Sequence, residues 1–574
     1  MAKGNALIRP LGATGTSRRR FVAGALMTGL GGAFLAACGG GGGGGGSGSN
    51  APAAPGGSAP AARTVKQGGT LNIGLPNEPE YQSLDANRTT GTWTHLISMS
   101  IFDTMVVEDK DKNLKPGLAQ SWEEAPDGLS VTFKLRPAVK FHDGTDFNAE
   151  AVKFWINRIA DKDNNRALAF SYLGPTYDST EVIDPLTAKI KLKTPNATLL
   201  RRMTRYYFGL PSPTAVEKAG LDNFARAPVG TGPFIFKEWV AKDRVVVTKN
   251  AAYNWAPEIF AHQGPPYLDA LNWRVIPDQA TRSAALESGD VKVIDEVPPV
   301  DVDRFSKDKN FTSVIAEPQG LSWLLRINTR LAPTNDILVR KALNHAINKD
   351  AIIKTVYYNV HAPAYSPLTS SSFGFNPNLK DLYPYDVNKA KQLLDQAGWT
   401  VGAGGVRQKG GQEMTLTYHT SYRTTAELIQ AQLRDVGMKI NIEILPAGTA
   451  TQNADLEHKN HFADAGSQQA GFLNEDPDIL RSTMHSRYDG SQGYASMIGF
   501  KDAALDDLLD KQQQLPRNEE RRKLLQDIQR IMMENAVMAP IFNGKKALVA
   551  TKDVSGVVIM PVNFYGFFYD ATIG

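Results

Sequence analysis

The first half of the chain carries short apolar runs separated by turn-forming residues, a pattern that predicts β-hairpins. Asp127-Gly128 marks one such turn. A longer segment begins at Asn148, a good helix N-cap, and repeats apolar side chains at helical spacing as far as Ala160. The strands expected in this half cover residues 70–75, 129–135, 181–183, 188–192, 234–240 and 244–248.

In the second half, helical and strand patterns alternate. Helices are expected at about 336–348, 386–397, 424–436, 502–513 and 517–535, with strands at about 413–419 and 438–445. Pro516 precedes the last helix, where it can start the first turn. A hairpin-rich first half and a second half of alternating helices and strands indicate a mixed α/β (α+β) fold with two dissimilar lobes.

The N-terminus carries a predicted export signal. Arg18 and Arg19 precede an apolar stretch over residues 23–37, which ends in Leu-Ala-Ala before Cys38. This stretch is shorter than the roughly 20 apolar residues of a membrane span and has the order of a cleaved leader. The Ser-Arg-Arg-x-Phe pattern resembles a twin-arginine leader, and Leu-Ala-Ala-Cys resembles a bacterial lipobox. We therefore expect residues 1–37 to be a signal peptide and Cys38 to carry a lipid anchor.

The leader also explains the net charge. The whole chain carries +4, whereas residues 1–37 hold five basic residues and no acidic one, so the remainder carries about −1. This balance gives no reason to expect nucleic acid as a partner. Cys38 is the only cysteine, so no internal disulfide can form and stability must come from core packing.

Residues 38–65 form a predicted tether. Eight consecutive glycines, Gly39–Gly46, lead into a segment rich in Pro and Ala. The glycines lack the strand, helix and lysine that surround a phosphate-binding loop. The body that follows runs for about 500 residues, which is too long for one small domain. It contains no second long apolar span and no fixed-period repeat.

A series of short motifs runs through this body. The most specific joins Lys-Phe-His-Asp-Gly-Thr at 140–145 to Phe-Asn-Ala-Glu-Ala-Val at 147–152. The others lie at 68–73, 83–85, 118–123, 229–234, 339–343, 346–349, 390–399, 430–438 and 539–541. Each motif alone is weak. Together and in this order they resemble the extracytoplasmic solute-binding proteins of peptide- and nickel-type ABC importers, solute-binding protein family 5.

The resemblance implies a bilobal periplasmic-binding-protein fold of the large three-domain type. Domain I would comprise residues 66–110, 228–322 and 541–574, domain II would be an insertion at 111–227, and domain III would span 323–540. Two crossovers between domains I and III would form a hinge, and a solute bound to both lobes would stabilise the closed form. The resemblance further implies a monomer without enzymatic activity, cofactor or metal. Its partners would be a small solute and the permease subunits of the importer, at the periplasm or cell surface.

Four loops are candidates for the ligand site by family position. An enclosed polar ligand needs a few placed charges and aromatic walls. Trp93 would form such a wall, although a role in the core is equally open. Arg423 would pair with a carboxylate, although arginines in such loops are more often solvated. The candidate contacts are Thr90, Thr92, Trp93, Trp323, Tyr422, Arg423, Gln469, Phe472, Asn474 and Asp476.

The loop at 468–476 departs from the family pattern. Many peptide-binding relatives have Trp-x-x-Asp shortly before an acidic-Pro pair, and that aspartate holds the N-terminal ammonium of the peptide. Alignment on Asp476 puts Ala470 and Leu473 at those two positions, with Glu475 nearby. A buried ammonium without its partner costs several kcal/mol. We therefore expect a solute without a free peptide amine, such as a blocked peptide, sugar, glutathione-like conjugate, opine or metal chelate.

Three other hypotheses follow from the sequence. A secreted hydrolase has little support, because the body has no Gly-x-Ser-x-Gly elbow, no His-Glu-x-x-His motif and no cysteine. His458 and His461 have a spacing that would put both imidazoles on one helix face, with Asp455, Glu457 and Asp464 nearby, and such a pair can bind a divalent ion. A sensor or chaperone on the same fold is the third.

The lone His142 is interpreted as a turn-stabilising side chain.

Overall fold

The structure is a computed structural model, and it describes residues 8–10, 66–79, 83–88, 92–161, 163, 168–445, 459–465, 476–488, 498–559 and 566–574. Every described residue belongs to one compact unit made of residues 1–12 and 66–574. Arg18, Arg19, Cys38 and the tether lie outside the described residues, so the export signal and the lipid anchor stay predictions. Within the described ranges, no helix has both the length and the apolar character needed to cross a membrane.

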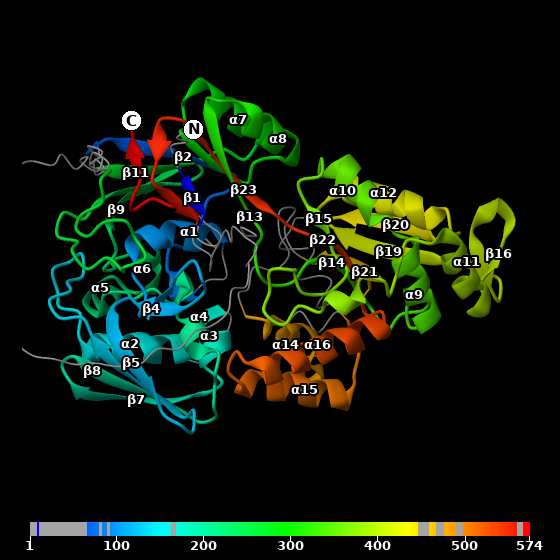
Figure 1. Cartoon of the computed structure of the whole chain (residues 1–574), viewed down its shortest axis with the longest axis horizontal. Helices are drawn as coiled ribbons and strands as arrows, with labels where there is room; N and C mark the ends of the chain where they lie inside the picture. Colours follow the sequence, from blue (N-terminus) through cyan, green and yellow to red (C-terminus); the bar gives the residue numbers. More distant parts are fainter. Residues whose placement is uncertain are drawn as a thin grey trace, which may run out of the picture. The chain divides into compact units, whose positions relative to one another are not determined.

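A seven-stranded mixed sheet forms the centre of what we call lobe 1 (Figure 1). Its middle strand, β2, runs parallel to both neighbours, β11 and β12, and the outer strands are added antiparallel. Both edges of β2 are therefore paired, which fits its largely buried side chains. In sheet order the strands are β13 (Phe311–Ala316), β23 (Lys546–Thr551), β12 (Val293–Asp295), β2 (Thr70–Leu75), β11 (Ala270–Val275), β10 (Arg244–Lys249) and β9 (Phe234–Val240). Its helices are α1 (Thr92–Ile101), α7 (Gln279–Ser288) and α8 (Pro299–Lys307).

A four-stranded antiparallel sheet completes lobe 1. In sheet order its strands are β5 (Ala119–Glu124), β6 (Ser130–Leu135), β8 (Thr187–Leu192) and β7 (Tyr177–Asp184). Helix α2 (Ala149–Ala160) packs on this sheet, and the Oδ1 of its N-cap Asn148 accepts a hydrogen bond from the Ala151 amide at 3.0 Å. The smaller elements are β3 (Val106–Glu108), β4 (Leu114–Pro116), α3 (Leu168–Leu173), α4 (Leu199–Arg202), α5 (Pro213–Ala219) and α6 (Leu221–Arg226).

Lobe 2 is built on a six-stranded sheet. In sheet order its strands are β15 (Ala362–Pro363), β22 (Met538–Asn543), β14 (Trp323–Ile327), β21 (Phe462–Ala465), β19 (Thr415–Thr420) and β20 (Lys439–Ile444). The helices are α9 (Ile337–Ala346), α10 (Lys349–Val356), α11 (Val387–Gln396), α12 (Arg423–Arg434), α14 (Ile479–Met484), α15 (Ala503–Gln514) and α16 (Glu519–Glu534). Short strands elsewhere are β16 (Thr400–Val401), β17 (Arg407–Lys409), β18 (Gln412–Glu413), β24 (Val554–Ser555), β25 (Val557–Ile559), β26 (Gly566–Phe567) and β27 (Thr572–Ile573). In addition, β1 (Ile8–Pro10) pairs in parallel with β25.

Each lobe has its own hydrophobic core. One cluster of buried side chains runs through both sheets of lobe 1 and includes Trp155 and Trp273, and another fills lobe 2 around Trp323 and Tyr418. The chain passes between the large sheets twice, through residues 317–322 and 544–545. Figure 1 shows the second crossover as the red path from β22 to β23. The mixed, bilobal fold expected from the sequence is confirmed, and the exact domain boundaries remain a prediction.

Most predicted elements are present, with ends displaced by a few residues. Two details were wrong. Pro516 does not start the last helix: α16 begins at Glu519, because the Oδ1 of Asn518 accepts a hydrogen bond from the Arg521 amide at 2.9 Å and caps it. The segment around His461 leads into strand β21 instead of a helix, since it pairs with β14 and β19 inside the lobe-2 sheet.

Candidate functional site

The carboxyl ends of three neighbouring strands meet at one edge of the lobe-2 sheet. Strands β19, β20 and β21 run parallel, and β14, which begins at Trp323, runs antiparallel to β21. The crossover into β14 therefore enters at the same edge. In lobe 1, β2 and β12 end beside the beginning of β23, where the other crossover arrives. Ligands of open α/β sheets bind outside the carboxyl ends of the strands, so the space between these two edges is the candidate site.

Aromatic rings cluster at the lobe-2 edge of this space. Trp323 is fully buried, stacks on Phe542 at a centroid distance of 5.0 Å and meets the ring edge of Tyr422 at 6.2 Å. The ring of His361 stacks on Phe542 at 4.5 Å. Among the described residues, the indole Nε1 of Trp323 has no hydrogen-bond partner. The structure thus brings the predicted Trp323 and Tyr422 together, while their contact with a ligand stays a prediction.

Asp464 places a carboxyl group beside these rings. Burial raises its pKa to about 6, which Thr420 and Arg326 oppose only in part. Burial also raises the pKa of Tyr422, and the charge of Asp464 adds to that effect, so the two side chains are neighbours. The Oδ1 of Asp464 is buried and finds no partner in the described part of the chain. It is therefore available to accept a hydrogen bond from a solute.

A buried ion pair stands at the facing edge of lobe 1. The Nζ of Lys546, at the start of β23, lies 3.0 Å from Asp295 Oδ2, at the end of β12, and both side chains are buried. The ring of Trp93 lies 5.9 Å from this Nζ and is 5% exposed. Glu296, directly after Asp295, contributes to the raised pKa of Tyr422 after burial and Asp464. Trp93 belongs to the core of lobe 1, and its contact with a ligand stays a prediction.

Arg423 and Asp476 are held by protein partners. Arg423 begins α12 with its side chain 67% exposed and 3.5 Å from Glu427 one turn later. Asp476 is 1% exposed, and its two oxygens accept hydrogen bonds from Arg521 at 3.1 and 2.5 Å. The pairing of Asp476 is that of a buried structural side chain, whereas the partner of Arg423 is exposed. A ligand contact by either residue stays a prediction. The remaining candidates, Thr90, Gln469, Phe472, Asn474 and the side chain of Thr92, lie outside the described residues.

The lobes also touch through charged and polar groups at a second place. Arg202, in α4 of lobe 1, is fully buried, and its Nη2 lies 3.9 Å from Asp478 Oδ2 in lobe 2. Lys112, between β3 and β4, donates a hydrogen bond from Nζ to the Ser371 carbonyl oxygen of lobe 2 at 3.2 Å. Arg201 pairs with the fully buried Glu108 on the lobe-1 side. Movement of one lobe against the other must break the contacts of Arg202 with Asp478 and of Lys112 with Ser371.

Two histidines singled out in the sequence serve the backbone. Gly230 N donates to His142 Nδ1 at 3.4 Å, and His142 Nε2 lies 3.0 Å from the Gly232 oxygen. Burial lowers the pKa of His142 to about 4, so the ring is neutral at pH 7. The Nδ1 of His461 accepts from the Thr417 amide at 2.9 Å. The turn-stabilising interpretation of His142 is confirmed.

The hypothesis of a metal site finds no support in the residues that the structure describes. Within them, no group of three or more His, Cys, Asp or Glu side chains is placed to hold a metal ion. His458, Asp455 and Glu457 lie outside the described residues.

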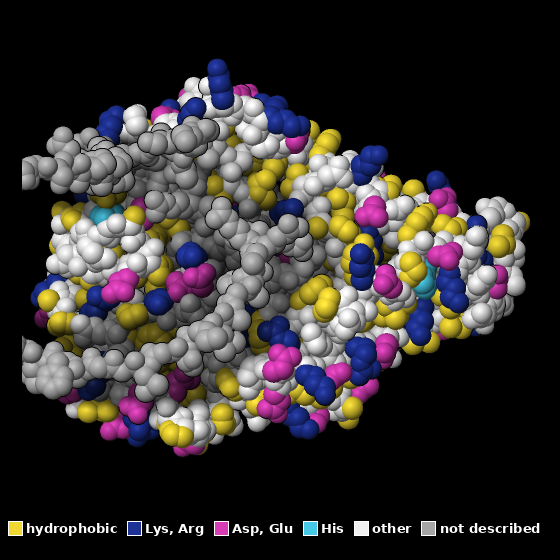
Figure 2. Space-filling view, in the orientation of Figure 1, with side chains coloured by type: hydrophobic (Ala, Val, Ile, Leu, Met, Phe, Trp, Pro, Cys, Tyr) yellow, Lys and Arg dark blue, Asp and Glu magenta, His cyan; other side chains and the backbone are white. Residues whose placement is uncertain are grey.

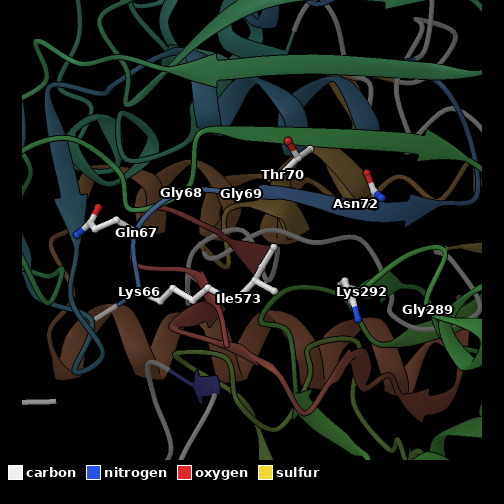
Figure 3. A pocket seen from close by; sticks show the side chains of 9 residues that line it. All are labelled: Lys66, Gln67, Gly68, Gly69, Thr70, Asn72, Gly289, Lys292 and Ile573. Atoms are coloured by element: carbon white, nitrogen blue, oxygen red, sulfur yellow. The ribbon is translucent and has the colours of Figure 1, made fainter. Parts of the chain in front are cut away.

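A cavity of about 310 Å³ lies elsewhere, at the amino end of β2 (Figure 3). Lys66, Gln67 and Thr70 contribute to its wall, and Lys292 is engaged with Asp553 at 3.1 Å. Because the crossovers are at the carboxyl ends of β2 and β12, this cavity is at the opposite edge of the lobe-1 sheet. It is not part of the candidate site.

Sequence reasoning missed the Lys546–Asp295 pair and the position of Asp464 in the site. A weak signal existed for Asp295, since a polar residue at the end of a buried strand often faces a ligand cleft. Its partner is far away in the chain, and no local pattern links the two. Asp464 was noticed only as a neighbour of His461, because the segment was interpreted as a helix.

Comparison with known proteins identifies the family of this chain. Residues 113–491 match the family described as "Bacterial extracellular solute-binding proteins, family 5 Middle". The chain is 29% identical to the glutathione-binding protein GsiB of Shigella flexneri, over 85% of this chain and 92% of the relative. NikA from Brucella suis, solved with Fe(III)-EDTA, superposes with a TM-score of 0.77 and 27% identity, over 88% of this chain and 100% of that one. DppA from Helicobacter pylori, solved with the peptide STSA, gives a TM-score of 0.73 and 26% identity, over 88% of this chain and 99% of that one.

These relatives are named as binding proteins and not as enzymes. Their coverage includes both lobes, and the family match spans the lobe-1 insertion and most of lobe 2. The chain therefore belongs to the bacterial extracellular solute-binding proteins of family 5, the substrate-binding proteins of ABC importers.

Proposed function

We propose that this chain is a lipid-anchored, extracytoplasmic protein that captures a small polar solute between its lobes and delivers it to the permease of an ABC importer. The observation that carries the proposal is the pair of facing sheet edges joined by the crossovers at 317–322 and 544–545. Aromatic and charged side chains from both edges, Trp323 and Asp464 opposite Asp295 and Lys546, line the space. A solute that contacts both edges favours the closed arrangement.

The sequence supports the location. Arg18 and Arg19 fit a twin-arginine leader, and Cys38 fits a lipid attachment site after cleavage. Removal of residues 1–37 would also remove β1, which contributes three residue pairs with β25. The Gly- and Pro-rich tether would then hold a monomeric body away from the membrane, at the periplasm or cell surface.

The proposed solute lacks a free peptide amine. Leu473 stands where peptide-binding relatives carry the aspartate that holds this amine, and Asp476 is already paired with Arg521. The relatives bear names or ligands as different as glutathione, Fe(III)-EDTA and a peptide, so the family fold accepts many solutes. Blocked peptides, glutathione-like conjugates, opines, oligosaccharides and metal chelates form the range to test.

Thermal unfolding against a solute panel tests this proposal. The full chain with Cys38→Ser, which prevents lipidation, is heated with free dipeptides, N-acetylated dipeptides, glutathione, oligosaccharides, opines and nickel chelates. A ligand at 100 times its dissociation constant stabilises the folded state by about 2.7 kcal/mol. We expect a shift with at least one solute other than the free dipeptides. A shift with free dipeptides alone would mean that another acid, such as Glu475, replaces the missing aspartate.

A further inference from the structure

Positive charge accumulates where the two lobes touch. The residues concerned, which we call the interlobe charge cluster, are Glu108, Lys112, Arg201 and Arg202 of lobe 1 and Asp476, Asp478, Arg517 and Arg521 of lobe 2. Its three carboxylates all have arginine partners: Glu108 pairs with Arg201, Asp476 with Arg521, and Asp478 with Arg481 as well as Arg202. Neither Lys112 nor Arg517 forms an ion pair with any of these three carboxylates.

Lys112 is held toward lobe 2 by a constrained turn. The Oδ1 of Asp109 accepts hydrogen bonds from the amides of Asp111 and Asn113, both at 2.9 Å, and Lys112 adopts a left-handed backbone with φ of 68°. Its ammonium donates to the Ser371 carbonyl oxygen at 3.2 Å. No carboxylate of the described residues forms an ion pair with it.

Arg517 presents a second cation from the other lobe. Its Nη2 lies 3.5 Å from Gln319 Oε1, a long hydrogen bond to a neutral group, and its guanidinium lies 4.9 Å from the Phe373 ring centroid. The Nε is buried and has no hydrogen-bond partner in the described ranges. The guanidinium therefore retains a donor that points at no acceptor, which is costly unless something else binds there.

The two cations are near enough to repel each other. Burial, and then the positive charge of Arg517, lower the pKa of the Lys112 ammonium. Burial, and then the charge of Arg201, lower the pKa of Arg517 to about 10. Glu108 and Glu317 offset this effect at Lys112, and Asp476 and Glu108 offset it at Arg517, in both cases only in part. Closure of the lobes thus brings like charges together.

We propose that Lys112, Arg201 and Arg517 form an anion site between the lobes, which takes a carboxylate or another oxyanion carried by the solute. Arg201 Nη1 donates a hydrogen bond to the Lys112 carbonyl oxygen at 3.1 Å, so these two cationic residues adjoin each other. Charge-assisted hydrogen bonds from ammonium and guanidinium groups to an oxyanion are among the strongest in proteins. A bound anion engages Arg517 Nε and offsets the repulsion, so the closed form is favoured with an anionic solute and disfavoured without one. This inference rests on the proposed function and narrows it: glutathione-like conjugates, opines and carboxylate chelates fit, whereas neutral oligosaccharides do not.

Distance measurements across the lobes test the site directly. Cys38 is the only cysteine, so the full chain with Cys38→Ser takes a fluorophore pair at two introduced cysteines alone. Ser179→Cys in β7 and Gln514→Cys in α15 place the labels at exposed positions on opposite lobes. The variants are Lys112→Met and Arg517→Met. Lys110→Met is the matched control, since Lys110 is 63% exposed and pairs with Asp111. Lys112→Arg keeps the charge.

Sodium malonate and sodium sulfate serve as probes, each against sodium chloride at the same ionic strength. We expect malonate to increase energy transfer in the reference protein and in the Lys110→Met and Lys112→Arg proteins. The Lys112→Met and Arg517→Met proteins should show higher transfer without any anion and bind malonate about tenfold more weakly. A response to malonate alone assigns the site to a solute carboxylate, and an equal response to sulfate assigns it to oxyanions in general.

The inference is overturned if both methionine variants bind malonate as tightly as the reference protein does. It is also overturned if neither anion and neither methionine substitution changes the energy transfer between the two labels. Circular dichroism of each variant establishes that it is folded. The solute panel separates this result from the proposed function. If a neutral oligosaccharide stabilises the protein and the stabilisation survives both methionine substitutions, the solute-binding function stands and the anion site is refuted.

Discussion

Removal of the Asp476 carboxylate is expected to destabilise lobe 2 without acting on the solute directly. Asp476 precedes α14, and Arg521 lies in the first turn of α16, so their ion pair joins two helices of the lobe. Both side chains are only 1% exposed. In Asp476→Ala the guanidinium of Arg521 stays buried and keeps only Gln512 as a side-chain acceptor, at 3.2 and 3.0 Å.

The magnitude follows from that burial. Breaking a buried ion pair by removal of one partner costs about 3–5 kcal/mol, because the other charge is left uncompensated. Replacement of both partners, as in Asp476→Leu with Arg521→Met, removes both charges and is expected to recover most of the loss. The double variant should therefore be more stable than Asp476→Ala.

The pair also predicts a pH dependence. Burial alone would raise the pKa of Asp476, but the charges of Arg521 and Arg202 outweigh it and hold the pKa below its usual range. The folded state then binds fewer protons than the unfolded state at acidic pH. The stabilisation is fully present above the ordinary aspartate pKa of about 4 and is lost as the pH falls below it. Asp476→Ala should show a shallower acid destabilisation than the wild-type chain.

Urea unfolding at pH 7 and at about pH 2.5, followed by tryptophan fluorescence, measures these differences. Solute binding by the folded Asp476→Ala protein, at a temperature well below its unfolding transition, tests whether Asp476 contacts the solute directly. A variant with unchanged stability and abolished binding would refute the structural account, and Asp476 would then contact the solute as the sequence suggested.

Three further outcomes are expected. Gly230→Ala should reduce the melting temperature more than Gly144→Ala. A Cβ at Gly230 would lie 2.2 Å from the Ile101 backbone oxygen. A Cβ at Gly144 would meet open space, so only the φ of +84° opposes it, at a cost of about 1–2 kcal/mol. Equal losses would contradict the clash. The wild-type chain should lose stability as the pH falls from 6.5 to 4, because the buried His142 ring has a pKa of about 4 and the unfolded state takes up the proton first. His142→Gln, whose amide can replace both ring contacts, should reduce this loss. An unchanged pH profile in urea unfolding would contradict this. Arg423→Ala should change the affinity for an anionic solute less than about twofold in calorimetry, since its pair with Glu427 is exposed; a tenfold loss would restore it as a ligand contact.

Local features of the fold were predictable from the sequence because short-range chemistry fixes them. The Asn148 cap and the apolar face of α2 were found because the residues that decide a helix lie within a few positions of each other. The two strands of the hairpin β7–β8 were found in the same way, from the apolar runs at 181–183 and 188–192. The turn-stabilising role of His142 was predicted, but its partners Gly230 and Gly232, which are far away in the chain, were not.

The site was less predictable because distant parts of the chain assemble it. Lys546 meets Asp295, and Lys112 meets the Ser371 carbonyl, only after the lobes have folded. Asp464 was misplaced because β21 is short and takes its strand conformation from its neighbours in the sheet. The ligand role of Arg423 stays a prediction, since its side chain is 67% exposed and lies 3.5 Å from the exposed Glu427.

The outer surface adds a consistent detail. Figure 2 shows Lys and Arg interspersed with Asp and Glu over the lower face of lobe 2, where α15 and α16 lie in Figure 1. Several of these charges pair within one helix turn, as Lys511 with Asp507 and Arg530 with Glu534 do, at 2.5 and 3.0 Å. Mixed charges of this kind give solubility and no extended field of one sign.

Capture of a solute between the lobes is tested most directly by small-angle X-ray scattering. The full chain with Cys38→Ser is measured alone and with the solute that gives the largest thermal shift. The account predicts a smaller radius of gyration on solute addition, with half of the change at the solute concentration that half-saturates binding in calorimetry. A radius that stays constant while calorimetry shows a filled site would contradict capture by closure of the two lobes.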